Sequence, residues 1–201
     1  MSEYYEKPEV IFKNIKNLLS KAVRDRGHPY HTPAFSNISI DNQVESRLVV
    51  LRKFDEINLI LNFHTDFRSP KIKNLKNTSS SYMLFYDPKI KIQLRIKTLS
   101  TIHNLNSVSK KAWDYTKLAS RKCYLAQISP TSTTSKPEDG IPNHLIGTDP
   151  SKHESETGYK NFAVIENKIK NIDWLYLKSS GHRRLNINCT QKNPKFKWLI
   201  P

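Results

Sequence analysis

Residues 46–71, SRLVVLRKFDEINLILNFHTDFRSPK, contain two β-branched runs followed by a polar turn. The runs SRLVVLRKF and INLILNFH are typical of antiparallel strands joined by a tight connection. After the second run, Ser69 is a candidate N-cap and Pro70 stands at the first helical position, which predicts a short helix over residues 69–77. The turn concentrates four side chains that can contact an anion: Thr65, Arg68, Ser69 and Lys71.

This turn is a candidate phosphate site. A phosphate dianion is held by a bidentate arginine, a lysine, hydroxyl groups and free N–H groups of a helix start, and Arg47 on the neighbouring strand would complete that set. The alternative is a group of surface ion pairs that contribute little to stability. Its members would be Arg47, Arg68 and Lys71 with Asp66, Asp55 and Glu45. Spacing alone leaves both interpretations open.

The segments around this stretch predict the fold class. Residues 8–25 place apolar side chains on one helical stripe. Strand-like runs follow at 35–40, 81–87 and 90–103, and in the last of these Gln93 and Arg95 face away from an apolar row. A further helix is expected over 107–121, an exposed loop over 129–158 and three β-like segments from residue 162 onward. We expect one domain, 1–201, that is mainly β with flanking helices (α+β) and forms a small closed barrel.

Composition limits the function classes. The net charge of +15, from 33 Lys+Arg against 18 Asp+Glu, would attract phosphate-bearing partners. No zinc-finger spacing, aromatic RNA-binding motif or basic zipper is present, so nucleic-acid binding is the disfavoured interpretation. No apolar run is long enough for a membrane helix, and Glu3, Glu6 and Glu9 argue against a signal peptide. Cys123 and Cys189 have no nearby metal ligands, so we expect reduced thiols, no metal site and a cytoplasmic location.

Four motifs together resemble the pyridoxamine 5'-phosphate oxidase-like FMN-binding split barrels. The first two are Arg47-Leu48-Val49-Val50-Leu51-Arg52 and Thr65-Asp66-Phe67-Arg68-Ser69-Pro70-Lys71. The others are Gln93-Leu94-Arg95 and His182-Arg183-Arg184, with Trp198-Leu199-Ile200-Pro201 at the end. The motifs span most of the chain in the family's order, and we identify the chain as a member on their joint occurrence.

The resemblance implies a six-stranded antiparallel split β-barrel that forms a homodimer with FMN at the subunit interface. Arg47, Ser69 and Lys71 would hold the phosphate, and Gln93 would hydrogen-bond the flavin edge. Arg184 would come from the partner subunit, with a group near Trp174 or Leu175. The cofactor-binding residues implied in this way are Arg47, Leu48, Val49, Val50, Leu51, Arg52, His64, Thr65, Arg68, Ser69, Lys71, Gln93 and Arg184.

The substrate residues match the family only in part. The resemblance implies substrate contacts by Arg52, Arg121 and His182, but Lys117 stands where the family has a tyrosine and Leu125 where it has a serine. Two functions remain open: an FMN-dependent oxidoreductase acting on a small molecule, and a non-catalytic FMN carrier or sensor. The three retained cationic or titratable residues favour the enzyme. The loop 129–158 is expected to shape the substrate pocket.

Overall fold

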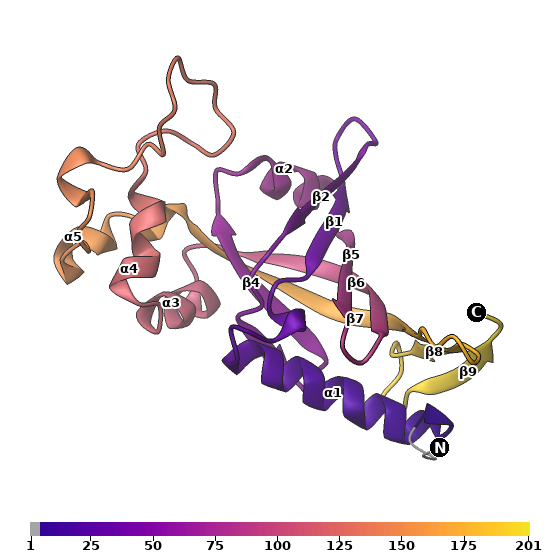
Figure 1. The fold of residues 1–201 in the computed structure, drawn as a ribbon. Coiled ribbons are helices and arrows are strands. Elements are labelled where there is room, and N and C mark those ends of the chain that lie inside the picture. Colours follow the sequence, from indigo (N-terminus) through magenta and orange to yellow (C-terminus); the bar gives the residue numbers. More distant parts are fainter. Residues whose placement is uncertain (1–4) are drawn as a thin grey trace.

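A computed structural model describes residues 5–201 (Figure 1). The first helix, α1 (Pro8–Arg24), lies across one end of a twisted sheet, and its extent agrees with the prediction. Ile11, Ile15, Leu19 and Ala22 recur at helical spacing and are buried against the strands, which explains why this segment is an amphipathic helix. No helix among the described residues is long and apolar enough to cross a membrane.

The sheet is antiparallel and has nine strands. Hydrogen bonding connects the strands in the order β2-β1-β5-β6-β7-β4-β3, and the hairpin β8–β9 extends the sheet from β7. Their bounds are β1 (Ala34–Ile38), β2 (Val44–Leu48), β3 (Lys53–Asp55), β4 (Ile60–Asp66), β5 (Ser80–Asp87), β6 (Ile92–His103), β7 (Phe162–Tyr176), β8 (Arg183–Asn188) and β9 (Lys195–Leu199). The mainly β class with flanking helices is thereby confirmed.

The sheet is not closed into a ring, in contrast to the closed barrel expected, and it has more than the six strands expected. Within the described residues, β2 and β3 at the two ends of the pairing path do not pair with each other. The single strand predicted over 46–54 is wrong, because residues 49–52 leave the ladder there. Val49 N–H bonds to Pro33 O, whereas Arg52 N–H bonds to Asn62 O, so the chain changes partner from β1 to β4.

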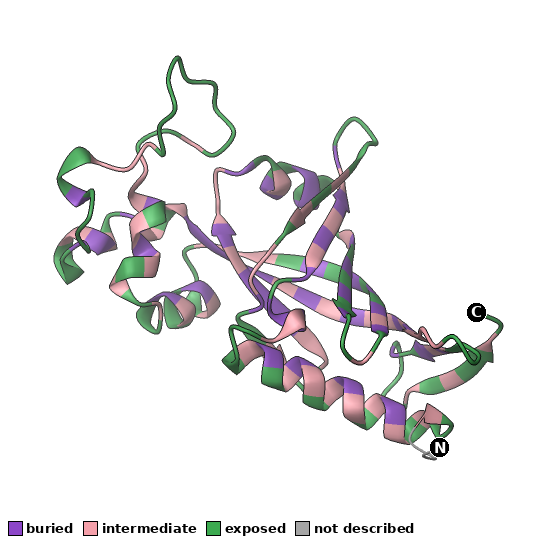
Figure 2. Cartoon of the chain, viewed as in Figure 1, coloured by how far each residue is buried: buried purple, intermediate pink, exposed green. Residues whose placement is uncertain are grey.

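The core lies between the sheet and α1 (Figure 2). On β6, Ile92, Leu94 and Ile96 are fully buried, while Gln93 and Arg95 face the other way, as predicted. The second predicted helix is present as α2 (Pro70–Asn77), which follows β4 directly. It packs near β1 and β6 and so fixes the position of the turn that precedes it.

A lobe between β6 and β7 holds the remaining helices, which are α3 (Ser107–Asp114), α4 (Leu118–Arg121) and α5 (Lys152–Glu156). Short 3-10 helices lie at Pro29–His31, Lys122–Leu125, Asn143–Leu145 and Tyr159–Asn161. The helix predicted over 107–121 is interrupted at Lys117, whose backbone is extended, and the Arg121 guanidinium donates to the carbonyls of Trp113 and Thr116 before the break. A continuous helix would need those carbonyls for its own N–H groups. Much of 129–158 is exposed, as predicted, but it contains α5.

Candidate functional site

The turn between β4 and α2 gathers three of the predicted phosphate ligands. Lys71 donates hydrogen bonds from Nζ to Thr65 Oγ1 at 2.9 Å and to Ser69 Oγ at 2.7 Å. Ser69 precedes the helix as expected, but its hydroxyl forms no cap hydrogen bond and instead accepts from Lys71. Both hydroxyl-bearing residues are buried, so the ammonium is held at a fixed place. We call Arg47, Thr65, Ser69 and Lys71 the cradle.

Arg47 reaches the cradle from β2. It pairs with Phe35 in the register of β1 and β2, and its guanidinium carbon lies 5.9 Å from the centre of the Phe35 ring. The guanidinium donates to Asn37 and, at 2.5 Å, to Glu45 Oε2. Because Glu45 Oε2 also accepts from Asn74 of α2 at 3.0 Å, this carboxylate joins β2 to α2.

The electrostatics show that the two cations of the cradle lie close together. Burial, and after it the charge of Arg47, lowers the pKa of Lys71 to about 8 against the opposing effect of Asp66 and Glu45. Lys71 forms no ion pair with any described acidic side chain. Of the two interpretations left open by the sequence, the ion pairs therefore account for Arg47 with Glu45 but not for Lys71.

Arg68 contacts other groups. Its guanidinium forms a bidentate pair with Asp66, at 3.0 Å from Nε and 2.6 Å from Nη2. A further bond from Nη1 reaches Ala126 O at 2.9 Å, in the loop after α4. These bonds tie the start of α2 to the lobe. They show a structural part for Arg68, and its predicted contact with the cofactor stays a prediction.

Residues 48–52 lead from the cradle to a cavity. Leu48 is exposed, Val49 and Val50 are half-buried, and Leu51 is fully buried on the core side. Arg52 is exposed at the end of this segment and lines the cavity. The segment therefore connects the place predicted to hold a phosphate with a cavity that Arg52 and His64 both line.

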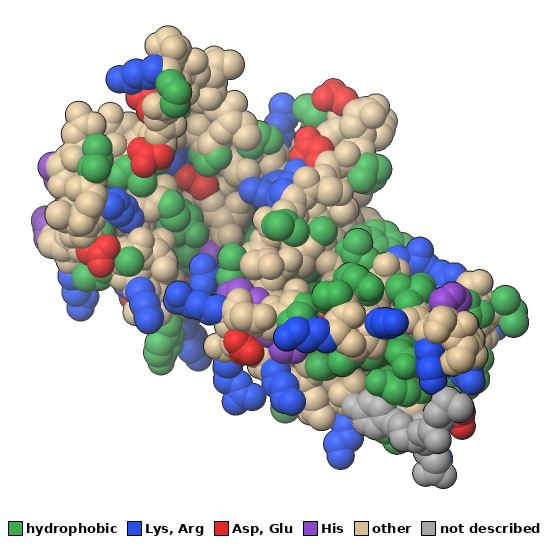
Figure 3. Space-filling model, in the orientation of Figure 1, with side chains coloured by type: hydrophobic (Ala, Val, Ile, Leu, Met, Phe, Trp, Pro, Cys, Tyr) green, Lys and Arg blue, Asp and Glu red, His purple; other side chains and the backbone are tan. Residues whose placement is uncertain are grey.

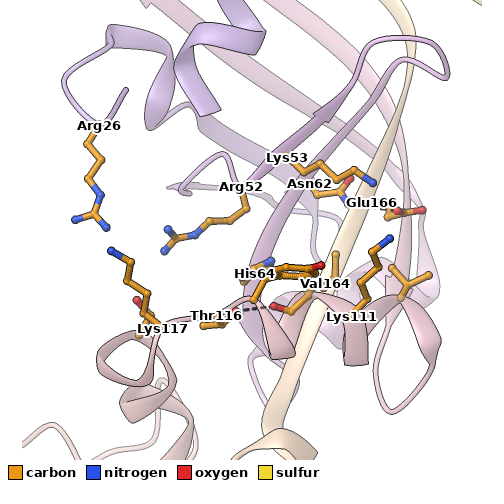
Figure 4. Close-up of a pocket in the computed structure, with 14 residues that line it drawn as sticks. Arg26, Arg52, Lys53, Asn62, His64, Lys111, Thr116, Lys117, Val164 and Glu166 are labelled. Carbon is orange, nitrogen blue, oxygen red and sulfur yellow. Dashed lines mark hydrogen bonds between the residues drawn. The ribbon is translucent and has the colours of Figure 1, made fainter. Parts of the chain in front are cut away.

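The cavity has a volume of about 550 Å³ and lies between β4, β7 and the lobe (Figure 4). Its lining contains five cationic side chains and one carboxylate, that of Glu166. Lysine and arginine side chains also gather where the lobe meets the end of α1 on the face shown in Figure 3. The lining residues are Arg26, Arg52, Lys53, Asn62, His64, Val108, Lys111, Ala112, Tyr115, Thr116, Lys117, Ser120, Val164 and Glu166.

His64 is a neutral imidazole in this cavity. Burial, together with the nearby positive charge of Arg52, lowers its pKa to about 4. Its ring meets the Phe162 ring edge-on, with 4.8 Å between the ring centres. His64 and Thr65 are consecutive on β4, so their side chains point to opposite faces of the sheet. The histidine lines the cavity, and the threonine belongs to the cradle.

Arg121 does not line the cavity. Only 4% of the residue is exposed, and its guanidinium carbon lies 4.5 Å from the centre of the Trp113 ring. It donates to Thr116 O, Trp113 O, Ser155 Oγ and Glu156 Oε1 at 2.8–3.1 Å. A substrate contact would require these bonds to break, and this predicted role stays untested.

Gln93 and Arg184 lie on the outer face of the sheet. Gln93 is opposite Leu175, and Leu175 is opposite Arg184, so all three side chains share one face. Arg184 is bound to Asp173 by two hydrogen bonds, at 3.0 and 2.7 Å. Burial acts to raise the pKa of Asp173, but hydrogen bonds from Arg184 and Arg95 outweigh it and hold that pKa below its ordinary value.

His182 lies before β8, where its Nδ1 accepts from the Lys178 N–H at 3.1 Å. It is not among the residues of the cavity. The single chain therefore brings together the cradle, and it brings Arg52 and His64 together in the cavity. It does not bring Gln93, Arg184 or His182 to either place.

Four cavity cations were not predicted: Arg26, Lys53, Lys111 and Lys117. Lys117 had a usable signal, since it stands at a substrate position of the resembled family. Arg26 follows the predicted end of the first helix, and nothing in the sequence brings this loop near residues 107–121. Glu166 and Asn62 are linked by a hydrogen bond of 3.2 Å across β4 and β7, a pairing that only the register shows.

Comparison with known proteins supports the motifs. Residues 13–104 match the family described as pyridoxamine 5'-phosphate oxidase, FMN-binding domain. No curated protein matches the chain. A pyridoxamine 5'-phosphate oxidase-related FMN-binding protein from Nostoc punctiforme PCC 73102 has a similar structure, with a TM-score of 0.71 at 17% identity over 94% of this chain and 96% of that one.

PhzG from Burkholderia lata 383, whose structure was determined in complex with tetrahydrophenazine-1-carboxylic acid, is also similar. The TM-score is 0.70 at 18% identity, and the match covers 100% of this chain and 97% of that chain. At this level of identity both likenesses show the fold alone.

Proposed function

We propose that this protein is an FMN-dependent oxidoreductase acting on a small molecule, because residues 13–104 match the family described as pyridoxamine 5'-phosphate oxidase, FMN-binding domain, in agreement with the motifs. The matched family model describes an FMN-binding domain, which supports FMN as the cofactor. We propose further that the chain acts as one split-barrel domain and forms a homodimer.

The cradle fits the phosphate of FMN. It offers one guanidinium, one ammonium and two hydroxyl groups, the donor set that binds a phosphate dianion. The observation that carries the proposal is the position of Lys71, which is fixed by Thr65 and Ser69 beside Arg47 and is not neutralised by a described carboxylate. Glu45, the nearby acid, is already bound by Arg47 and Asn74.

An exposed apolar face of the sheet supports the proposed homodimer. Leu48 on β2 and Leu84 on β5 both lie opposite Ala34 and share the outer face of the sheet, where they are 72% and 42% exposed. Tyr82 and Tyr86 lie two residues before and two residues after Leu84, so they are on the same face, where both are exposed. A partner subunit that covers this face would bury apolar surface and would bring its own Arg184 and His182 toward the first subunit's cofactor.

When bound, FMN supplies the two-electron redox chemistry. The chain's own part is to bind and orient. Arg52 offers a positive charge to an anionic substrate in the cavity, and His64, being neutral, offers one hydrogen-bond donor and one acceptor. The lobe, through α3, forms one wall of the cavity.

Cycling of the bound flavin separates the enzyme from a carrier or sensor. FMN-loaded protein is incubated without oxygen with NADH, NADPH or small reduced substrates, and air is then admitted. An oxidoreductase loses its flavin absorption with one of these reductants and regains it in air, repeatedly and faster than free FMN at equal concentration. A carrier or sensor binds FMN but cycles no faster than free FMN. Protein that binds no FMN contradicts both functions.

A further inference from the structure

The resemblance assigns a substrate contact to Arg121, but the structure uses this arginine inside the lobe. Its guanidinium lies over the Trp113 ring, and all its described hydrogen bonds go to residues of the lobe. Its neighbours Lys117 and Ser120 line the cavity instead. An anion in the cavity would therefore contact the cations that line it and not Arg121, the arginine that the resemblance implies.

Arg26, from the loop after α1, lines the cavity. Figure 4 shows that Arg26, Arg52 and Lys117 point toward one another from three separate parts of the chain. None of these three side chains forms a hydrogen bond or an ion pair with another described residue. Five other arginines do have carboxylate partners, namely Arg47, Arg68, Arg95, Arg121 and Arg184.

Three like charges without a counter-ion repel one another, and an anion placed between them would relieve that repulsion. The one carboxylate of the cavity, Glu166, does not serve as the counter-ion. It is bound to Asn62 at 3.2 Å and lies 3.3 Å from His103 Nε2, on the β4–β7 wall.

The walls between the charged groups are apolar. Val108 and Ala112 of α3 line the cavity and pack against the apolar cluster that contains Val164 of β7, and the neutral ring of His64 lines the same cavity. A cavity of about 550 Å³ with such walls suits a ligand with an apolar ring body. Arg26, Arg52 and Lys117 would then bind an acidic group attached to that body.

We propose that Arg26, together with Arg52 and Lys117, binds an acidic group of the substrate and so selects ring compounds that carry a carboxylate or a phosphate. This inference rests on the proposed function for its claim that the ligand is a substrate. Arg26 is the specificity-determining residue and has the role in substrate binding that the resemblance assigns to Arg121.

The test measures binding of three matched probes by calorimetry, with and without FMN: naphthalene-2-carboxylate, its carboxamide and 2-naphthyl phosphate. Arg26→Ala should weaken binding of an acidic probe about tenfold or more, since a charge-assisted contact is lost. It should leave carboxamide binding unchanged. Loss of affinity for the carboxylate, for the phosphate or for both identifies which acidic group these three cations bind. Arg26→Lys should restore part of the affinity.

Arg24→Ala is the matched control, because Arg24 is exposed in the last turn of α1 and does not line the cavity. Equal effects of Arg24→Ala and Arg26→Ala would overturn the inference, as would equal weakening of the carboxamide. FMN binding is measured separately on each variant. Unaltered FMN binding with no acid preference refutes only the inference, whereas a protein that prefers acids but binds no FMN refutes only the proposed function.

Discussion

Lys71 on α2 and Arg47 on β2 lie close enough for their charges to oppose each other. Burial first, and then the guanidinium of Arg47, lowers the pKa of the Lys71 ammonium to about 8. The fold holds these two cations together through Glu45, which binds Arg47 and also Asn74 of α2. A phosphate bound beside both cations would relieve this repulsion, which is the physical basis for proposing that the turn binds a phosphate.

FMN affinity should depend on pH through Lys71. The ammonium has a pKa of about 8 without ligand, and a bound phosphate dianion would raise that pKa. The protonated form therefore binds more tightly, and affinity should fall as the pH rises above about 8, by at most about tenfold per pH unit. Fluorescence titration of FMN at several pH values measures the slope.

Lys71→Arg keeps the charge through this range and should abolish the slope, whereas Lys73→Arg should retain it, because Lys73 is exposed on the same helix. An identical slope in wild type and Lys71→Arg would show that another group titrates.

Arg121→Ala should destabilise the protein without changing the cradle. The substitution removes the contact with Trp113, the hydrogen bond to Thr116 O and the charged partner of Glu156, at a cost of about 2–4 kcal/mol in the free energy of unfolding. Urea denaturation measures the loss. Below the transition, FMN affinity should equal that of wild type. A folded variant of normal stability that has lost substrate binding would instead support the direct contact implied by the resemblance.

Leu84→Lys should prevent formation of the proposed homodimer. Leu84 lies on the exposed outer face of β5, and a lysine charge buried in an apolar interface is strongly unfavourable. Light scattering after size exclusion should give the mass of a dimer for wild type and of a monomer for the variant, with weakened FMN binding.

Ile57→Lys is the control, because Ile57 is 92% exposed between β3 and β4, away from this face. A wild-type monomer that binds FMN fully would contradict the shared site.

Local sequence signals predicted most of the elements but not how the sheet ends. The stripe in α1 and the alternation in β6 are properties of neighbouring residues, and both agree with the structure. The break at 49–52 depends on Pro33, His31 and Asn62, which accept its N–H groups from other segments. The end of α3 likewise depends on where the Arg121 side chain turns.

The cradle was predictable because its members, apart from Arg47, fall within residues 65–71. The cavity was not, since Arg26, Lys117 and Glu166 meet only when α1, the lobe and β7 pack around β4. Arg68 shows that residue type alone does not predict a side chain's partners. It belongs to the same polar turn as Lys71, yet it pairs with Asp66 and donates to Ala126 O. Residue type alone did not distinguish Arg68 from Lys71, and only the packing showed that Arg68 is held by a carboxylate while Lys71 is held by two hydroxyl groups.

The most direct measurement is the ratio of the dissociation constants of riboflavin and FMN in wild type, Arg47→Ala, Lys71→Ala and Lys73→Ala. If the cradle binds the phosphate, wild type and Lys73→Ala should prefer FMN by about a hundredfold or more, and each cradle substitution should reduce that preference about tenfold or more. Equal affinity of wild type for riboflavin and FMN, or an undiminished preference in both Arg47→Ala and Lys71→Ala, would contradict the assignment.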